Sequence, residues 1–245
     1  NLNDWSWDCI APGDTRFFPV TMETYQAGKL ARYGTANPEP VENLFWIEMA
    51  RKNWPPSRAR QQFDDPAVTN EDNRHPTGGQ ESAVPRLAIW SSDREQCTEL
   101  SLRDGRHLCI GGEISKYSDE RQDAWIYNDI LVTHPDKSVA IYAYTLNDFP
   151  LMSGLSSVKA DDKVLIFGRG QRDGELAHSP MALVLDPEGF KIRLLDRMAA
   201  RRPVVITEEP VEKDDAILFS VQKRRSEDPD EFVQFCLKTL SWLEV

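Results

Sequence analysis

Three pairs of adjacent carboxylates are the residues of this chain best suited to acid–base chemistry. They are Asp161-Asp162, Glu208-Glu209 and Asp214-Asp215. Two of the pairs, Asp161-Asp162 and Asp214-Asp215, stand directly before hydrophobic runs that occupy equivalent places in two successive sequence repeats, and Asp104-Gly105 stands at that place in an earlier repeat. Asp and Gly in such places are typical of turns, whereas general acid or base work needs a carboxyl in an apolar cleft. The two repeated pairs, Asp161-Asp162 and Asp214-Asp215, are therefore predicted to be turn residues.

The four histidines show no metal-binding spacing. They are His75, His107, His134 and His178, and no two of them form an H-x-H or H-x-x-x-H pattern. The chain also has no G-x-S-x-G elbow, phosphate loop or dinucleotide fingerprint. We therefore expect no catalytic residue, no metal site and no cofactor, and we predict that the protein is not an enzyme.

Four short hydrophobic runs, separated by turn residues, recur three times along the chain. The first copy covers Ser101 to Tyr144, the second Leu155 to Leu194 and the third Val204 to Val245. The runs are rich in Val, Ile, Leu, Tyr and Trp, which favour strands, and Gly, Pro and Asp lie between them. Repeats of about 50 residues with four strands each are typical of propeller blades of the kelch kind.

The first copy carries a local signature as well as a pattern. Its Cys109-Ile110-Gly111-Gly112 doublet resembles the kelch signature, as do the following Tyr117 and Trp125. From about Arg86 onward the chain resembles the kelch or galactose-oxidase-type repeat proteins of bacteria. The resemblance implies a mainly β fold of four-stranded blades forming a partial propeller, and a binding scaffold more than any one chemistry. Three blades cannot close a ring, so exposed blade flanks could also pair two copies of the chain.

The connection after the second strand of each repeat is long and charged. The three connections are Glu113 to Asp123, Gln171 to Ser179 and Gln222 to Glu231. Equivalent positions in a repeat array lie on one face, and loops on a rigid scaffold often bind partners; the alternative is that they are only solvated. The predicted partner-binding residues are Glu113, Tyr117, Asp119, Glu120, Arg172, Asp173, Glu175, Asp228 and Asp230. Tyr117 and Arg172 would anchor a partner, and the acidic residues would steer a basic one.

Charge and composition limit the classes of partner. The chain has 40 acidic and 29 basic residues, for a net charge of −11, which argues against direct nucleic-acid binding. No apolar run approaches the roughly 20 residues of a membrane span. Cys109 and Cys236 lie inside hydrophobic runs, where a buried apolar role is expected, and the cysteines show no disulfide or C-x-x-C framework. We expect a cytoplasmic protein with reduced thiols.

The N-terminal part is predicted to hold an aromatic arm and short helices. Residues 1–68 form this segment, residues 69–84 a polar linker, and residues 85–245 the β-repeat domain. A helix is expected after Pro38 and Pro40, where Leu44, Ile47, Ala50 and Trp54 return at helical spacing, and Pro55-Pro56 ends it. A second short helix, capped by Ser57, is expected through Arg58 to Phe63. We expect these helices to dock on the strands, because a hairpin of this size cannot bury a core alone.

These observations favour a non-catalytic protein-binding module. Its most specific form is an acidic bacterial immunity protein that inhibits a basic toxin, such as a nuclease, by covering a positive cleft. Two alternatives stay open. One is a sugar-active propeller enzyme of the epimerase or oxidase type, and the other is a structural module that self-associates.

Overall fold

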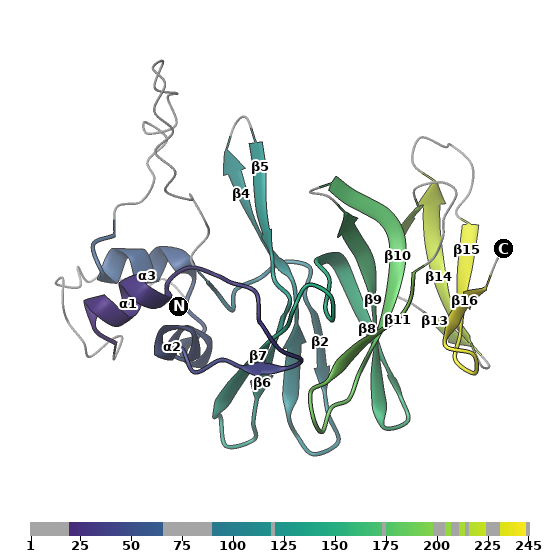
Figure 1. The fold of residues 1–245 in the computed structure, drawn as a ribbon, viewed down its shortest axis with the longest axis horizontal. Coiled ribbons are helices and arrows are strands. Elements are labelled where there is room, and N and C mark those ends of the chain that lie inside the picture. Colours follow the sequence, from purple (N-terminus) through teal and green to yellow (C-terminus); the bar gives the residue numbers. More distant parts are fainter. Residues whose placement is uncertain are drawn as a thin grey trace, which may run out of the picture. The chain divides into compact units, whose positions relative to one another are not determined.

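A computed structural model describes residues 20–65, 90–118, 121–172, 175–197, 204–206, 211–213, 216–223 and 231–243 (Figure 1). The chain divides into two compact units. Unit 1 comprises 1–31, 42–93 and 116–123, and unit 2 comprises 32–41, 94–115 and 124–245. Among the described residues, no helix is long and apolar enough to cross a membrane.

The described part of unit 1 contains three short helices, α1 (Met22–Gly28), α2 (Leu44–Lys52) and α3 (Pro56–Gln62). Helix α2 begins at Leu44, the first apolar residue of the predicted run, because Asn43 caps it by accepting from the backbone N–H groups of Phe45 at 3.0 Å and Trp46 at 3.4 Å. Helix α3 begins at Pro56, so Pro55 rather than Ser57 occupies the N-cap position, and no side chain caps the helix. Proline suits the first helical position, because its fixed φ is already helical and its missing N–H would have no partner there.

The aromatic residues of unit 1 pack against one another. Trp46 and Trp90 stack at 5.1 Å between ring centroids and are fully buried. Tyr25 stacks on Phe63 at 4.2 Å, and its hydroxyl donates to Asp65. These rings pack together within unit 1, and docking of the helices on the strands stays a prediction.

In the described residues of unit 2, three antiparallel sheets follow one another along the chain (Figure 1). The first contains β2 (Thr98–Ser101), β3 (His107–Ile110), β6 (Asp129–Thr133) and β7 (Val139–Ala143), with the short β1 (Glu39–Pro40) added beside β7. The second contains β8 (Met152–Ala160), β9 (Lys163–Arg172), β10 (Glu175–Leu185) and β11 (Ile192–Arg197). The third contains β12 (Val204–Ile206), β14 (Ala216–Lys223), β15 (Glu231–Cys236) and β16 (Ser241–Leu243), with β13 (Val211–Lys213) paired to β14.

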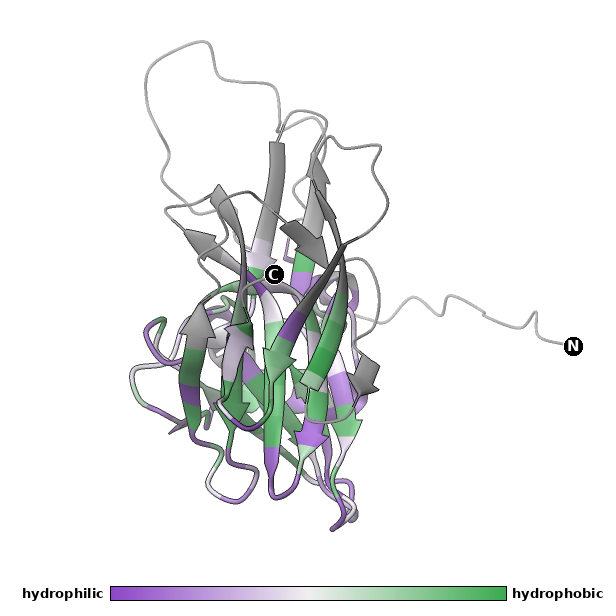
Figure 2. Ribbon diagram, turned by 90° about the vertical axis from the view of Figure 1, so that its right-hand side faces the viewer, coloured by the Kyte–Doolittle hydropathy of each residue, from purple (hydrophilic) through white to green (hydrophobic). Residues whose placement is uncertain are grey.

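Each sequence repeat forms one sheet, as predicted, and the fold is mainly β. The strands of a sheet pair in chain order, which is the arrangement of a four-stranded blade. Hydrophobic residues lie along the strand bodies, and hydrophilic ones gather at the turns at their lower ends (Figure 2).

The second sheet is buried on both faces. Successive side chains of a strand point to opposite faces, so Val164 and Ile166 join one hydrophobic cluster while Leu165 and Phe167 join another. The first cluster includes residues of the first sheet, such as Ile130, and the second includes residues of the third sheet. This two-sided burial explains why β9 reads as an unbroken apolar run rather than an alternating one.

The predicted charged loops are partly strands, which corrects the sequence-based interpretation. The first forms the hairpin β4 (Glu113–Ser118) and β5 (Arg121–Ile126), while β9 and β10 extend through most of the second. In the third, β14 continues to Lys223 and β15 begins at Glu231. Strand pairing is made by backbone hydrogen bonds, which charged side chains do not prevent and composition does not reveal.

Candidate functional site

The glycine doublet at the end of β3 lets another backbone segment come very close. Gly111 has φ 58° and Gly112 has φ 97°, a region that favours glycine. A Cβ atom on Gly112 would lie 2.9 Å from the Cβ of Cys97 and 3.0 Å from the carbonyl oxygen of Glu95. The doublet therefore positions the segment from Arg94 to Cys97 against the end of β3.

Arg94 anchors this segment in the interior of unit 2. Its guanidinium pairs with the carboxylate of Asp129, with Nη2 at 3.1 Å from Oδ2 and Nη1 bonded to Oδ1. Nη1 also donates to the Gly111 carbonyl at 3.0 Å, and the guanidinium lies 3.8 Å from the Tyr127 ring centroid. Burial lowers the pKa of Arg94, but Asp129 outweighs that effect and raises it. The segment is thus fixed by a charged group that stays ionised.

Glu95 and Glu113 are held opposite each other. The Glu95 N–H donates to the Glu113 carbonyl at 2.9 Å, and the Glu113 N–H donates back at 2.8 Å. Residues that exchange both bonds have Cα atoms about 5.5 Å apart and side chains on the same face. Burial raises the pKa of the half-buried Glu113, the charge of Glu95 raises it further, and Arg169 opposes both. The pair thus combines a half-buried carboxyl whose pKa is raised with a second carboxyl that is exposed.

Gln96 fixes the position of the Glu113 carboxyl. Its Nε2 donates to Glu113 Oε1 at 2.8 Å, and its Oε1 accepts from the Gly154 N–H at 3.0 Å. Gln96 itself has φ 53°, which is uncommon for a residue with a side chain. Gly154 lies at an irregularity in the pairing of β8 with β9, where a Cβ atom would be 3.4 Å from Arg169 Nη2. The Gln96 side chain therefore links Glu113 to the second sheet.

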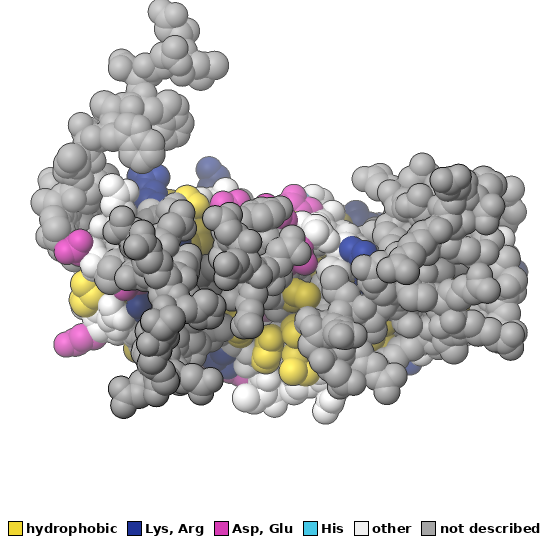
Figure 3. Space-filling model, turned by 90° about the horizontal axis from the view of Figure 1, so that it is seen from above, with side chains coloured by type: hydrophobic (Ala, Val, Ile, Leu, Met, Phe, Trp, Pro, Cys, Tyr) yellow, Lys and Arg dark blue, Asp and Glu magenta, His cyan; other side chains and the backbone are white. Residues whose placement is uncertain are grey.

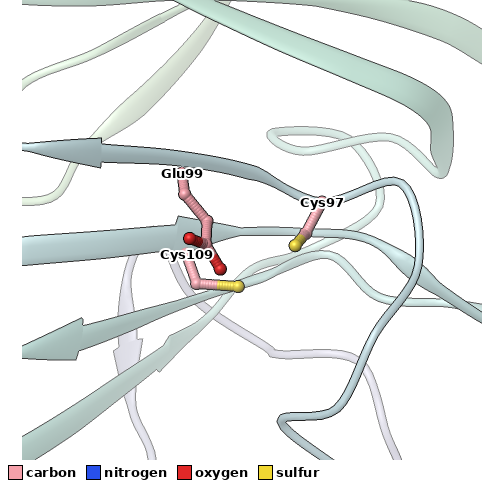
Figure 4. A group of neighbouring side chains, drawn as sticks. All are labelled: Cys97, Glu99 and Cys109. Carbon is pink, nitrogen blue, oxygen red and sulfur yellow. The ribbon is translucent and has the colours of Figure 1, made fainter.

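Two thiols and a carboxylate gather beside this segment (Figure 4). The ligand atoms of Cys97, Glu99 and Cys109 all lie within 4.8 Å of one another. The hydrogen bond with Cys109 lowers the pKa of Cys97 to about 7, although burial and Glu99 act in the opposite direction. The same hydrogen bond, together with burial, raises the pKa of Cys109. Cys109 is buried as predicted, and Cys236 is partly buried.

The predicted partner-binding residues are only partly within the described structure. Glu113 is described and belongs to the glutamate pair. Arg172 and Glu175 are backbone register partners in the pairing of β9 with β10, and Tyr117 lies in β4. Asp119, Glu120, Asp173, Asp228 and Asp230 lie outside the described residues. On the face seen from above, the described acidic and basic side chains are interspersed (Figure 3). Binding of a basic partner at this face stays a prediction.

The sequence-based search missed four of these residues. Glu95, Gln96, Cys97 and Glu99 precede the first predicted repeat or lie at its edge, and none belongs to a known motif. The one local signal is Cys97-x-Glu99, whose spacing of two places both side chains on one face of a strand. Of the carboxylate pairs, Asp161 lies in the β8–β9 turn with φ 54°, as predicted, while Glu208-Glu209 and Asp214-Asp215 lie outside the described residues.

Unit 2 also contains a cavity of about 730 Å³ near the β10–β11 turn. Its polar lining residues are Asn37, Asn147, Asp148, Asp186, Lys163, Lys191 and Arg193. Several are already engaged: Asp148 accepts from Thr145 at 2.6 Å, and Asn37 bonds both backbone groups of Ile192 at 2.6 and 2.9 Å. These bonds support the packing of β11, so we place the candidate site at the glutamates instead.

Among known proteins, only solved structures show a similarity to this chain. No protein-family model matches the chain, and no curated protein matches it. One similar structure is the GH32 β-fructofuranosidase BmSUC1 of Bombyx mori, at 8% identity and a TM-score of 0.39, covering 64% of this chain and 37% of the enzyme. Another is the GH43_1 enzyme of Xanthomonas citri in complex with xylose, at 10% identity and a TM-score of 0.40, covering 62% and 53%. The chain thus spans well under two thirds of either enzyme.

These neighbours correct one expectation and leave another without support. Both are glycoside hydrolases, so the expectation that the protein is not an enzyme is wrong. They give no support to a toxin-inhibiting role. The kelch resemblance stays a prediction, because no family model matches, while the mainly β fold of successive antiparallel sheets is confirmed.

Proposed function

We propose that the protein is a sugar-active enzyme that cleaves glycosidic bonds at the Glu95–Glu113 pair. The observation that carries the proposal is the reciprocal backbone pairing, which sets two carboxyl groups on one face beside an arginine. Glycoside hydrolysis commonly uses two carboxyl groups in different protonation states. Support comes from the residues of this chain, since the similar structures are too distant to carry an argument about chemistry.

In this proposal Glu113 is the acid, because burial raises its pKa. A carboxyl with a raised pKa is suited to give its proton to the glycosidic oxygen as the bond to the sugar breaks. The carboxylate of Glu95 faces the positive charge that develops on the sugar ring. Water then bonds to that sugar carbon and gives a proton to the ionised Glu113, which restores the acid. Gln96 holds the Glu113 carboxyl by a bond of 2.8 Å, which limits the rotation of the acid.

The site is open on the Glu95 side. Glu95 and Gln96 are exposed, whereas Glu113 is half-buried. A substrate can therefore approach from solvent with its leaving-group oxygen toward Glu113. Arg169 lies close enough to Glu113 to lower its pKa, so its guanidinium is placed to bind sugar hydroxyls beside the acid.

The test is turnover on a panel of aryl glycosides and oligosaccharides. The unaltered protein should release sugar from at least one of them, and Glu113→Gln should lower kcat by about 10²–10⁴-fold. The loss should be greatest for substrates with a poor leaving group, because these need the proton most. The matched control is Glu188→Gln, which alters an exposed glutamate in the β10–β11 turn and should leave the rate unchanged. Absence of turnover across the panel, or equal rates for both variants, would overturn the proposal.

A further inference from the structure

The register of β2 and β3 brings three metal-ligand groups to one face. Glu99 stands directly opposite Cys109 in the ladder. Cys97 precedes Glu99 by two residues, so an extended backbone turns its side chain to the same face. Figure 4 shows the two sulfur atoms and the Glu99 carboxylate directed toward one another.

The spacing of these atoms suits a metal ion of zinc size. Zinc binds thiolate sulfur at about 2.3 Å and carboxylate oxygen at about 2.0–2.2 Å in a tetrahedral arrangement, which puts neighbouring ligand atoms somewhat under about 4 Å apart. The three ligand atoms here already lie within 4.8 Å of one another. Small side-chain rotations are enough to close the remaining difference, and they need no change in the ladder.

The surroundings hold the ligands in place. His107 follows on the same face of β3, with Nε2 at 3.5 Å from Glu99 Oε2 and Nδ1 at 3.2 Å from Ser101 Oγ. The Cys97 thiol donates to the Arg94 carbonyl at 3.9 Å. Outer partners of this kind fix the orientation of metal-binding side chains. Cys109 is buried and Glu99 is exposed, so the cluster is closed on the protein side and open to solvent on the other.

We propose that Cys97, Glu99 and Cys109 bind a divalent zinc-class ion, with His107 as a positioning residue for Glu99. Two sulfur ligands favour zinc over magnesium or calcium, which prefer oxygen alone. The fourth position faces solvent. The bound ion would link β2 to β3, and its ligand Cys97 is two residues from Glu95. This proposal of a metal site does not depend on the proposed hydrolysis.

The test is titration of the full chain, stripped of metal and kept reduced, with Co²⁺ alone. Bound cobalt should give thiolate-to-metal charge-transfer absorption and the d–d bands of a tetrahedral site, saturating at one equivalent, and Zn²⁺ should displace it. Cys97→Ser and Cys109→Ser should each abolish the charge-transfer signal of the pair or reduce it strongly. Glu99→Gln should weaken binding, and His107→Ala should weaken it by about 10–100-fold.

The matched control is Cys236→Ser, which removes a partly buried thiol of β15 that is not in the cluster and should leave the titration unchanged. Should Cys109→Ser fail to fold because that thiol is buried, Cys97→Ser decides the result, with circular dichroism to verify its fold. Zn²⁺ should also raise the Tm of the unaltered protein and not that of Cys97→Ser. The proposal is overturned by a titration without charge-transfer absorption, or by one that Cys97→Ser leaves intact.

Discussion

Two guanidinium nitrogens of Arg94 donate hydrogen bonds to the two carboxylate oxygens of Asp129, and the two side chains are only 0% and 4% exposed. Removing one member of such a buried pair leaves an uncompensated charge, which costs about 3–5 kcal/mol. Asp129→Asn should therefore lower the free energy of unfolding by about this amount in urea denaturation. Asp104→Asn, which breaks an exposed pair with Arg106, should have a far smaller effect. Equal effects of the two changes would show that burial of Arg94 is not what makes its pair matter.

We expect Gly112 to be needed for stability, because it allows the segment that carries Glu95 and Cys97 to lie close to the end of β3. Gly112→Ala places a methyl group 3.0 Å from the Glu95 carbonyl oxygen and keeps φ at 97°, so strain of about 1–2 kcal/mol is expected before any clash is counted. The variant should lose stability and displace the segment that carries Glu95. Gly189→Ala is the control, because its added Cβ would meet only the Asp186 carboxylate at 3.4 Å. Thermal melts of both variants make the comparison, and an unchanged Tm for Gly112→Ala would contradict it.

Phe167 joins the second and third sheets. It is fully buried and lies edge-on to Phe219 at 4.8 Å and to Phe235 at 5.1 Å between centroids. Phe167→Ala should cost about 3–5 kcal/mol by leaving a cavity among these rings. Leu146→Ala, at a side chain that is 44% exposed, should change stability by under about 0.5 kcal/mol. A small loss for Phe167→Ala in denaturant titration would mean that the two sheets do not depend on this ring.

Glu39 predicts a pH dependence with a defined sign. The hydrogen bond from Arg32 lowers its pKa from 4.5 to about 2, burial opposes this, and Thr35 adds further bonds. A lowered carboxyl pKa stabilises the folded state above the unfolded-state value, and this contribution disappears as the pH falls through the folded-state value. The stability difference between the unaltered protein and Glu39→Gln should be constant above about pH 4.5 and shrink toward pH 2. A difference that grew on acidification would contradict the assignment.

The repeats could be predicted from the sequence, because their information is local. Each strand carries its own apolar residues, and each turn its own Gly, Pro or Asp, so four runs per copy predict one four-stranded sheet. The β4–β5 hairpin could not be predicted in the same way. Its residues are mostly polar or charged, and its pairing is made by backbone groups that every sequence shares.

The candidate site depends on contacts that the sequence does not express. Glu95 and Glu113 meet in an isolated bridge that lies outside the strands containing the predicted runs. Cys97 and Cys109 reach one another only because the register sets Glu99 opposite Cys109. The Gly111-Gly112 doublet was recognised as a signature, but its effect, the close approach of the Arg94 segment, requires the three-dimensional fold.

The pH dependence of kcat/KM on a glycoside with a poor leaving group tests the proposed chemistry most directly. Glu113 must carry a proton to act as the acid, and burial raises its pKa, so activity should fall as the pH rises through a value above 4.5. Glu113→Gln should lose this alkaline limb, while Glu188→Gln should keep it. Hydrolysis with the limb unchanged in Glu113→Gln would contradict the assignment of the acid, and absence of hydrolysis at every pH would contradict the function.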